Sequence, residues 1–203
     1  MRQVPAAERS DASFALVAVA SSAGGFAALK QLLSDLSADI PAALLIVQHL
    51  DPKHRSLLAE LLDRRSALPV TEAKHGDVVT PGHAFVAPPD HHLLVDPDHT
   101  LVLTRTELVH FVRPSADLLF ESVAATFGPR AIAVVLSGTG LDGSMGVKAV
   151  KKMGGSVIAQ DEGSSDFFGM PSAAIMTGDV DVVAPVERIA SVLQSMVRAW
   201  SDR

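Results

Sequence analysis

Residues 15–36 read ALVAVASSAGGFAALKQLLSDL, and this stretch decides the fold class. It begins with an unbroken apolar run that has the length of a buried strand and ends in Ser-Ser-Ala-Gly-Gly. Beyond the glycines, Phe26 and the leucines at positions 29, 32, 33 and 36 recur at the spacing of one face of an α-helix. The stretch therefore predicts a buried strand, a tight turn of small residues and an amphipathic helix.

The same alternation of apolar runs and helical patterns continues along the chain. Further strands and helices are predicted at residues 43–47, 54–63, 131–136, 144–153, 156–159, 181–184 and 189–200. Strands that are apolar on both faces and alternate with helices indicate a mainly parallel sheet that is covered on both sides. We therefore predict a doubly wound α/β fold with helices on both faces of the sheet.

The middle of the chain has a different pattern. Residues 69–104 contain the short alternating runs HAFVA, HLLVD and TLVLT, separated by Pro, Gly and Asp. Such runs are typical of antiparallel hairpins. We predict a β-hairpin insertion near 69–104 within one domain that spans residues 14–203, preceded by an N-terminal tail at residues 1–13.

The composition excludes several classes of protein. The chain of 203 residues is 48% hydrophobic, which is enough for a sizeable core and argues against intrinsic disorder. A net charge of −6 and an aromatic content of 4% argue against general nucleic-acid binding. The absence of cysteine excludes disulfides and thiolate sites. No signal peptide and no apolar run near the ~18 residues of a membrane span are present, so we expect a cytoplasmic protein.

Polar side chains follow the three best strand candidates. Ser22 follows the first, His49 the second and Asp142 the third. Ligands of open parallel sheets bind beyond the carboxyl ends of the strands, so these three side chains can converge at one edge. A hydroxyl, an imidazole and a carboxylate are the components of an activated serine. Each residue alone also fits a structural role, but three such residues at three strand ends favour a catalytic site.

The sequence around Ser22 resembles a nucleophile elbow. Residues 20–24 read ASSAG, which is G-x-S-x-G with alanine at the first position, and they lie between a predicted strand and a predicted helix. Small residues allow the sharp turn that exposes a serine oxygen, and the N–H groups of the following helix can face an oxyanion. A helix cap is the alternative role of Ser22.

A second motif competes with this interpretation. Gly138, Gly140 and Gly143 match G-x-G-x-x-G between a strand and a helix, with acidic residues at 161–162, about 20 residues further on. This is the local pattern of a dinucleotide-binding domain. The motif lies late in the chain, however, and Asp142 would place a carboxylate where pyrophosphate binds, so we rank this alternative second.

The densest histidine cluster is Asp90-His91-His92. Neighbouring residues of a strand point to opposite faces, and the chain has no H-E-x-x-H motif, so we predict a solvated hairpin here and no metal site.

Arg113-Pro114-Ser115 is predicted to open a helix, with Ser115 as its N-cap and Asp117 in its first turn. Arg113 is a candidate for contact with a substrate carboxyl group.

Six segments, in order between about residues 14 and 199, resemble one known family. They are ASSAGG, LLIVQHL, PGHAFVAPPDHH, VRPSAD, VVLSGTGLDGSMG and FGMP. The chain resembles the catalytic domain of the protein-glutamate methylesterase of bacterial chemotaxis, the CheB family.

This resemblance implies a serine hydrolase that acts on γ-glutamyl methyl esters of chemoreceptors, and some family members also deamidate receptor glutamines. It implies Ser22 as nucleophile, His49 as base and Asp142 as the orienting acid, with the N–H of Thr139 as an oxyanion donor. No cofactor and no metal ion are implied.

Two departures from the family pattern stand out. Ala23 replaces the threonine that commonly follows the nucleophile, so this oxyanion candidate has no hydroxyl to contribute. Residues 1–13 are also too few for the receiver domain of the best-known members. The resemblance therefore implies a stand-alone esterase, or part of a longer protein such as a fusion with the receptor methyltransferase. Expected partners are the methylated cytoplasmic region of chemoreceptors and a separate regulatory or methyltransferase protein. A non-catalytic receptor-binding module is a further alternative.

Overall fold

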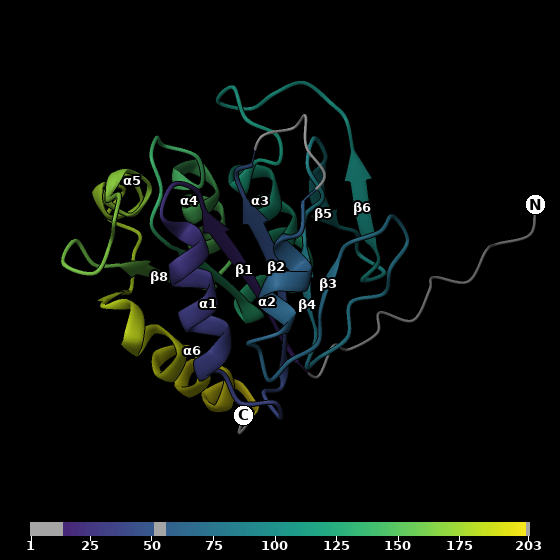
Figure 1. The fold of residues 1–203 in the computed structure, drawn as a ribbon, viewed down its shortest axis with the longest axis horizontal. Coiled ribbons are helices and arrows are strands. Elements are labelled where there is room, and N and C mark those ends of the chain that lie inside the picture. The colour runs from purple at the N-terminus through teal and green to yellow at the C-terminus, as the bar shows by residue number, and fades with distance from the viewer. Residues whose placement is uncertain (1–13, 51–55, 202–203) are drawn as a thin grey trace, which may run out of the picture.

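The computed structural model describes residues 14–50 and 56–201, and its centre is a seven-stranded parallel sheet (Figure 1). The strand order is β3-β4-β2-β1-β7-β8-β9. The strands are β1 (Ala15–Ser21), β2 (Ala42–Gln48), β3 (Val70–Glu72), β4 (Ala84–Val86), β7 (Ala131–Val135), β8 (Ser156–Gln160) and β9 (Val182–Ala184). This architecture confirms the predicted doubly wound α/β fold. The tail predicted at residues 1–13 lies outside the described residues.

Helices cover both faces of the sheet, as predicted. One face packs against α1 (Gly25–Asp35), α2 (Leu58–Asp63) and α6 (Val186–Ser201), which lie in front of the sheet in Figure 1. The other face packs against α3 (Ala116–Phe127), α4 (Ser144–Lys152) and α5 (Gly169–Met176), and a short 3-10 helix, η1 (Gly128–Arg130), follows α3. The predicted helix at 54–63 begins only at Leu58 among the described residues, and residues 51–55 lie outside them.

The apolar run of β1 is unbroken because this strand is buried on both faces between β2 and β7. Leu16, Ala18 and Ala20 belong to the core under α3, whereas Val17 and Val19 belong to the core under α1 and α6. From β1 the chain adds β2 on one side and later β7 on the other. The ends of β1 and β7 are therefore the point at which an open α/β sheet forms its ligand crevice.

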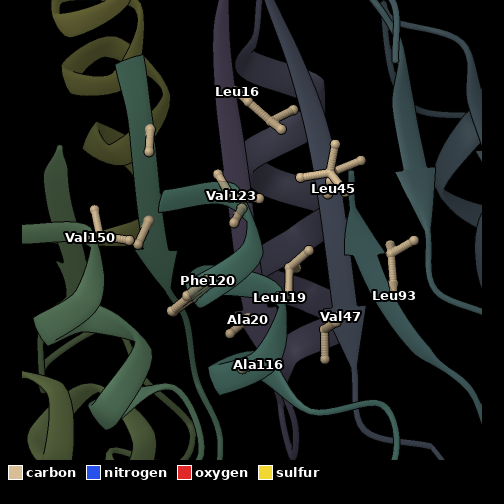
Figure 2. Packing of buried hydrophobic residues seen from close by; sticks show 14 of the residues in the cluster. Leu16, Ala20, Leu45, Val47, Leu93, Ala116, Leu119, Phe120, Val123 and Val150 are labelled. Carbon is tan, nitrogen blue, oxygen red and sulfur yellow. The ribbon is translucent and has the colours of Figure 1, made fainter. Parts of the chain in front are cut away.

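Helix α3 lies with its apolar face against β1 and β7 of the sheet. Figure 2 shows Leu119, Phe120 and Val123 of α3 packed over the strands, with Ala116 at the same end as Ala20 and Val47. The N-terminus of α3 therefore lies at the carboxyl ends of β1 and β2, where the predicted site residues follow.

The predicted hairpin insertion is shorter than residues 69–104. The runs HLLVD and TLVLT do form an antiparallel hairpin, β5 (His92–Val95) with β6 (Leu101–Thr104). The prediction is wrong for HAFVA, because β4 pairs in parallel with β2 and β3. The physical reason is burial: Ala84, Phe85 and Val86 are all buried, so β4 is an interior strand of the main sheet.

Glycine at position 146 permits close contact between α4 and α3. A Cβ atom there would lie 2.5 Å from Cβ of Phe120 and 3.0 Å from the carbonyl oxygen of Asp117. We expect Gly146→Ala to lower the free energy of unfolding by about 1–2 kcal/mol, since the overlap outweighs the helix propensity gained with alanine. Urea denaturation measures this change. Gly163→Ala, with nothing within 4 Å of its Cβ position, is the matched control, and equal loss in both variants would contradict the argument.

Candidate active site

Ser22 and His49 lie on adjacent strand ends. The backbone pairing of the sheet continues one residue beyond the strands, because the N–H of Ser22 donates to the carbonyl of Ser137 at 3.0 Å. The N–H of His49 likewise donates to the carbonyl of Ser21 at 3.1 Å. Ser22 is therefore held between the strand end that carries His49 and the loop after β7 that carries Asp142.

His49 and Asp142 form a close pair, with Nε2 of His49 2.9 Å from Oδ2 of Asp142. The pair is shielded from solvent, since the side chains are 12% and 4% exposed. With Nε2 engaged by the carboxylate, Nδ1 is the ring nitrogen left to exchange a proton. Among the described residues no hydrogen-bond partner is seen for the hydroxyl of Ser22, so no hydrogen bond joins it to His49 in this conformation.

The carboxylate of Asp142 accepts four hydrogen bonds. Besides His49, they come from the hydroxyl of Ser115 at 2.9 Å, the N–H of Ala116 at 2.6 Å and the N–H of Asp117 at 3.2 Å. Burial alone would raise the pKa of Asp142, but the hydrogen bonds from His49 and from the backbone at Ala116 outweigh it and lower the pKa. Asp142 is thus held as a carboxylate at the N-terminus of α3.

The turn after β1 depends on a side chain that the sequence analysis did not single out, Gln48. Its Nε2 donates to the carbonyl of Ser22 at 2.7 Å, and its Oε1 accepts a 2.6 Å hydrogen bond from the hydroxyl of Ser21. A Cβ atom at Gly25 would lie 2.6 Å from this Oε1, so the small residues of the motif allow the amide to reach the turn. The sequence feature that could have indicated this role is the position of Gln48, a polar residue at the end of a wholly buried strand.

Two backbone N–H groups are suited to an oxyanion. Among the described residues no acceptor is seen for the N–H of Ala23 or of Thr139, whereas the N–H of Gly138 donates to the carbonyl of Phe167 at 2.9 Å. A Cβ atom at Gly138 would lie 2.9 Å from Cβ of Ser22, so the glycine loop passes directly against the serine. The N–H of Thr139 belongs to the residue that directly follows this point of contact.

A cavity of about 610 Å³ opens beside Ser22. Large apolar side chains that are partly exposed make up much of its wall, and the carboxylate of Asp166 is its one charged lining group among the described residues. The partly exposed side chains are Phe26, Leu50, Leu57 and Leu61, and the buried Leu58 also lines the cavity. The size and the apolar lining suit the aliphatic part of a bound side chain, with its polar group beside Ser22 at the edge of the cavity.

Arg113 is held by other groups, and no contact with Ser22, His49 or Asp142 is seen among the described residues. Its Nε donates to Oδ1 of Asp90 at 2.9 Å and its Nη1 to the carbonyl of Thr106 at 2.6 Å. The guanidinium thus anchors the segment that leads to α3. The predicted helix start at Ser115, with Asp117 in the first turn, is confirmed.

His92 is not part of a solvated hairpin, so this prediction was wrong for one of the two histidines. Its side chain is fully buried, its Nε2 contacts the carbonyl of Glu107 at 3.0 Å and its Nδ1 accepts the N–H of Ser115 at 3.1 Å. Hydrogen bonds at both ring nitrogens compensate the loss of water. In the parts of the chain that the structure describes, no three His, Asp or Glu side chains are grouped to hold a metal ion.

The geometry of α4 disfavours a dinucleotide site at Gly138, Gly140 and Gly143. The N–H of Gly146 in the first turn of α4 donates to Oδ1 of Asp117 at 2.7 Å, so a carboxylate already takes part of the helix N-terminus. Pyrophosphate would meet this negative charge and that of Asp142. No helix within the described ranges is long and apolar enough to cross a membrane.

Comparison with known proteins supplies independent findings. The profile of a family described as CheB methylesterase matches residues 17–193. A "Protein-glutamate methylesterase/protein-glutamine glutaminase" of Moorella thermoacetica is 41% identical over 186 residues, covering 90% of this chain and 44% of the relative. A relative of the same name, numbered 2, from Burkholderia lata is 43% identical and covers 95% and 56%. The chain thus spans about half the length of these curated relatives.

A solved structure agrees with the same assignment. The catalytic domain of the CheB methylesterase of Thermotoga maritima superimposes with a TM-score of 0.87 at 35% sequence identity. The match covers 91% of this chain and 99% of that domain.

Proposed function

We propose that this chain, which belongs to the CheB methylesterase family, is a serine hydrolase that removes methyl esters from glutamate side chains of chemoreceptors. The observation that carries this proposal is the shielded pair of His49 and Asp142 at the strand end next to Ser22. A buried carboxylate that orients an imidazole beside a partly exposed serine turn is the arrangement that activates a hydroxyl.

In the proposed reaction, Nδ1 of His49 takes the proton of Ser22 while the serine oxygen attacks the ester carbonyl. The N–H groups of Ala23 and Thr139 stabilise the oxyanion. The tetrahedral intermediate collapses, His49 gives the proton to the departing methoxide, and methanol leaves an acyl-enzyme. Water, deprotonated by His49, then attacks the acyl carbon. The second tetrahedral intermediate collapses as His49 returns this proton to Oγ of Ser22, and the free glutamyl acid leaves and ionises to the carboxylate.

The same residues can deamidate glutamine, with ammonia in place of methanol as the leaving group. The chain's relatives carry both activities in their name, protein-glutamate methylesterase/protein-glutamine glutaminase. Protonation by His49 matters more for an amide, because an amide nitrogen is a poorer leaving group than methoxide. We therefore include receptor glutamines among the substrates, with hydrolysis slower than that of the ester.

The proposed partners are the methylated cytoplasmic region of chemoreceptors and a separate regulatory or methyltransferase protein, which places the reaction in the cytoplasm. The cavity beside Ser22 supports a protein substrate because its wall presents Phe26, Leu57 and Leu61, which are 41%, 52% and 42% exposed. Apolar side chains that stay exposed beside a reaction centre are typical of contact surfaces.

The test is methanol release from a methylated receptor fragment, together with labelling by a serine-directed phosphonate. We expect turnover, and one phosphonate adduct on Ser22 that blocks it. Ser34→Ala, an exposed change on the following helix, is the control and should keep both properties. Receptor binding with neither turnover nor labelling would favour the non-catalytic module instead.

The dinucleotide alternative makes a separate prediction. Ligand that binds the folded state alone raises the melting temperature. We expect NAD at millimolar concentration to leave the melting temperature unchanged, since carboxylates occupy the glycine loop and the start of α4. A rise that is lost in a Gly140→Asp variant would support a dinucleotide site.

A further inference from the structure

The hydroxyl of Ser115 lies next to the proposed triad without belonging to it. Ser115 is fully buried at the N-cap of α3, and its Oγ is 2.9 Å from Oδ1 of Asp142. A carboxylate can only accept, so the serine hydroxyl is the donor of this hydrogen bond. At the start of α3, Ser115 is the one side chain that donates to Asp142 among the described residues, the other two donors being the backbone N–H groups of Ala116 and Asp117.

The direction of this hydroxyl is set by its own surroundings. The N–H of Ser115 donates to Nδ1 of the buried His92, which fixes the backbone at this position. The N–H of Leu118 donates to Oγ at 3.5 Å, in the usual N-cap geometry. With a lone pair of Oγ facing Leu118, the single hydroxyl hydrogen is directed at Asp142.

The two carboxylate oxygens of Asp142 have different hydrogen-bond partners. Oδ2 faces His49 and the N–H of Ala116, while Oδ1 accepts from the hydroxyl of Ser115 and, at the longer distance of 3.2 Å, from the N–H of Asp117. The bond from Ser115 is therefore the shorter of the two that hold Oδ1. Rotation of the carboxylate about its Cβ–Cγ bond would break it and carry Oδ2 away from His49.

We propose that Ser115 is a positioning residue that holds the carboxylate of Asp142 in the orientation in which it directs His49. This inference rests on the proposed function, because it assigns Ser115 a part in the same reaction. Ser115 touches neither Ser22 nor His49 in the described structure and acts through Asp142.

Other charged groups surround Asp142, and the experiment must separate them from Ser115. His49 faces it from the end of β2, and the carboxylate of Asp117 lies on the side of α3 and α4. Burial raises the pKa of Asp117, and the negative charge of Asp142 raises it further, while His110, 3.0 Å from Oδ2 of Asp117, opposes this. None of these groups changes when the hydroxyl of Ser115 alone is removed.

Ser115→Gly and Ser115→Thr separate hydrogen-bond donation from helix capping. Glycine at an N-cap costs only a few tenths of a kcal/mol, so Ser115→Gly removes the donor and keeps the helix start. We expect kcat for methyl-ester hydrolysis to fall about tenfold with KM unchanged, the scale of one lost hydrogen bond to a charged group. Ser115→Thr keeps a hydroxyl and should recover kcat to within about threefold of wild type.

Ser122→Ala is the matched control in the same helix. Its hydroxyl donates to the carbonyl of Leu119 at 2.9 Å and accepts from the N–H of Val95, but it has no contact with Asp142. We expect kcat within about twofold of wild type. Equal losses in Ser115→Gly and Ser122→Ala would show a general effect on α3 and overturn the proposal.

A double-mutant cycle tests whether Ser115 acts through Asp142. The Asp142→Asn variant has no carboxylate for Ser115 to orient. In this background Ser115→Gly should therefore change the residual kcat by less than about twofold. A full tenfold loss in this background would mean that Ser115 acts by another route, and the proposal would fail.

A measurement without turnover keeps this inference separate from the proposed function. Removing a donor to the charged form raises the pKa of a carboxyl group. We therefore expect the ¹³C signal of the Asp142 carboxyl, assigned by its loss in Asp142→Asn, to titrate at higher pH in Ser115→Gly and as wild type in Ser115→Thr. An unchanged titration in Ser115→Gly overturns the inference, whether or not the protein releases methanol.

Discussion

Ser22→Ala is expected to lower kcat for methyl-ester hydrolysis by about three to six orders of magnitude. In the proposed mechanism Ser22 forms the acyl-enzyme. Alanine removes its oxygen, and the remaining N–H groups and His49 can then only assist direct attack by water. Methanol release under saturating substrate measures this loss. KM should change little, because the apolar wall of the cavity and the backbone of the turn remain.

The folded state should tolerate this change. Ser22 is only partly buried, and no hydrogen-bond partner of its hydroxyl is seen among the described residues. We therefore expect a midpoint of urea denaturation close to that of wild type. A Ser22→Ala protein that is equally stable and still releases methanol at the wild-type rate would exclude Ser22 as the nucleophile and remove the basis of the proposed mechanism.

Asp142→Asn is expected to lower kcat by about three to four orders of magnitude. The amide has no charge to stabilise a protonated His49. Its NH₂ group is a hydrogen-bond donor, so it cannot accept the N–H of the imidazole as the carboxylate does. Phosphonate labelling of Ser22 should slow in parallel, because in the proposed mechanism His49 activates the hydroxyl in both reactions. Asp181→Asn, which removes an exposed ion pair with Lys151, is the control and should leave both rates unchanged.

The stability of Asp142→Asn should depend on pH in a defined way. The hydrogen bonds of His49 and Ala116 lower the pKa of Asp142 below its ordinary value of 3.8 despite burial, so the carboxylate stabilises the folded state above that value. This contribution is lost as the pH falls through the lowered pKa. Urea denaturation should therefore show a stability deficit of the variant at pH 7 that shrinks at pH 3. A deficit that grows toward acid pH would contradict the direction of the pKa shift.

Much of the architecture follows from local sequence patterns. The runs at residues 15–20, 43–47 and 131–136 are apolar at every position, which only a strand buried on both faces requires, and helical spacing follows each run. The prediction of a hairpin strand was wrong for HAFVA. A three-residue strand carries too little pattern to distinguish a hairpin at the sheet edge from an interior strand. The prediction of a solvated hairpin failed for His92 because its two hydrogen-bond partners, the carbonyl of Glu107 and the N–H of Ser115, are distant from it in the chain.

The sequence by itself determined that Ser22 and His49 follow buried parallel strands and that Asp142 lies in a glycine-rich loop after a third. Residue type and distance from a strand end are local properties, so a single chain reveals them. Only the tertiary structure decided which groups hold Asp142, because the N-terminus of α3 reaches it through the packing of α3 on β1 and β7. Helix packing depends on the shapes of surfaces that are far apart in sequence, and for this reason Ser115 read as a helix cap until the fold placed its hydroxyl against the carboxylate.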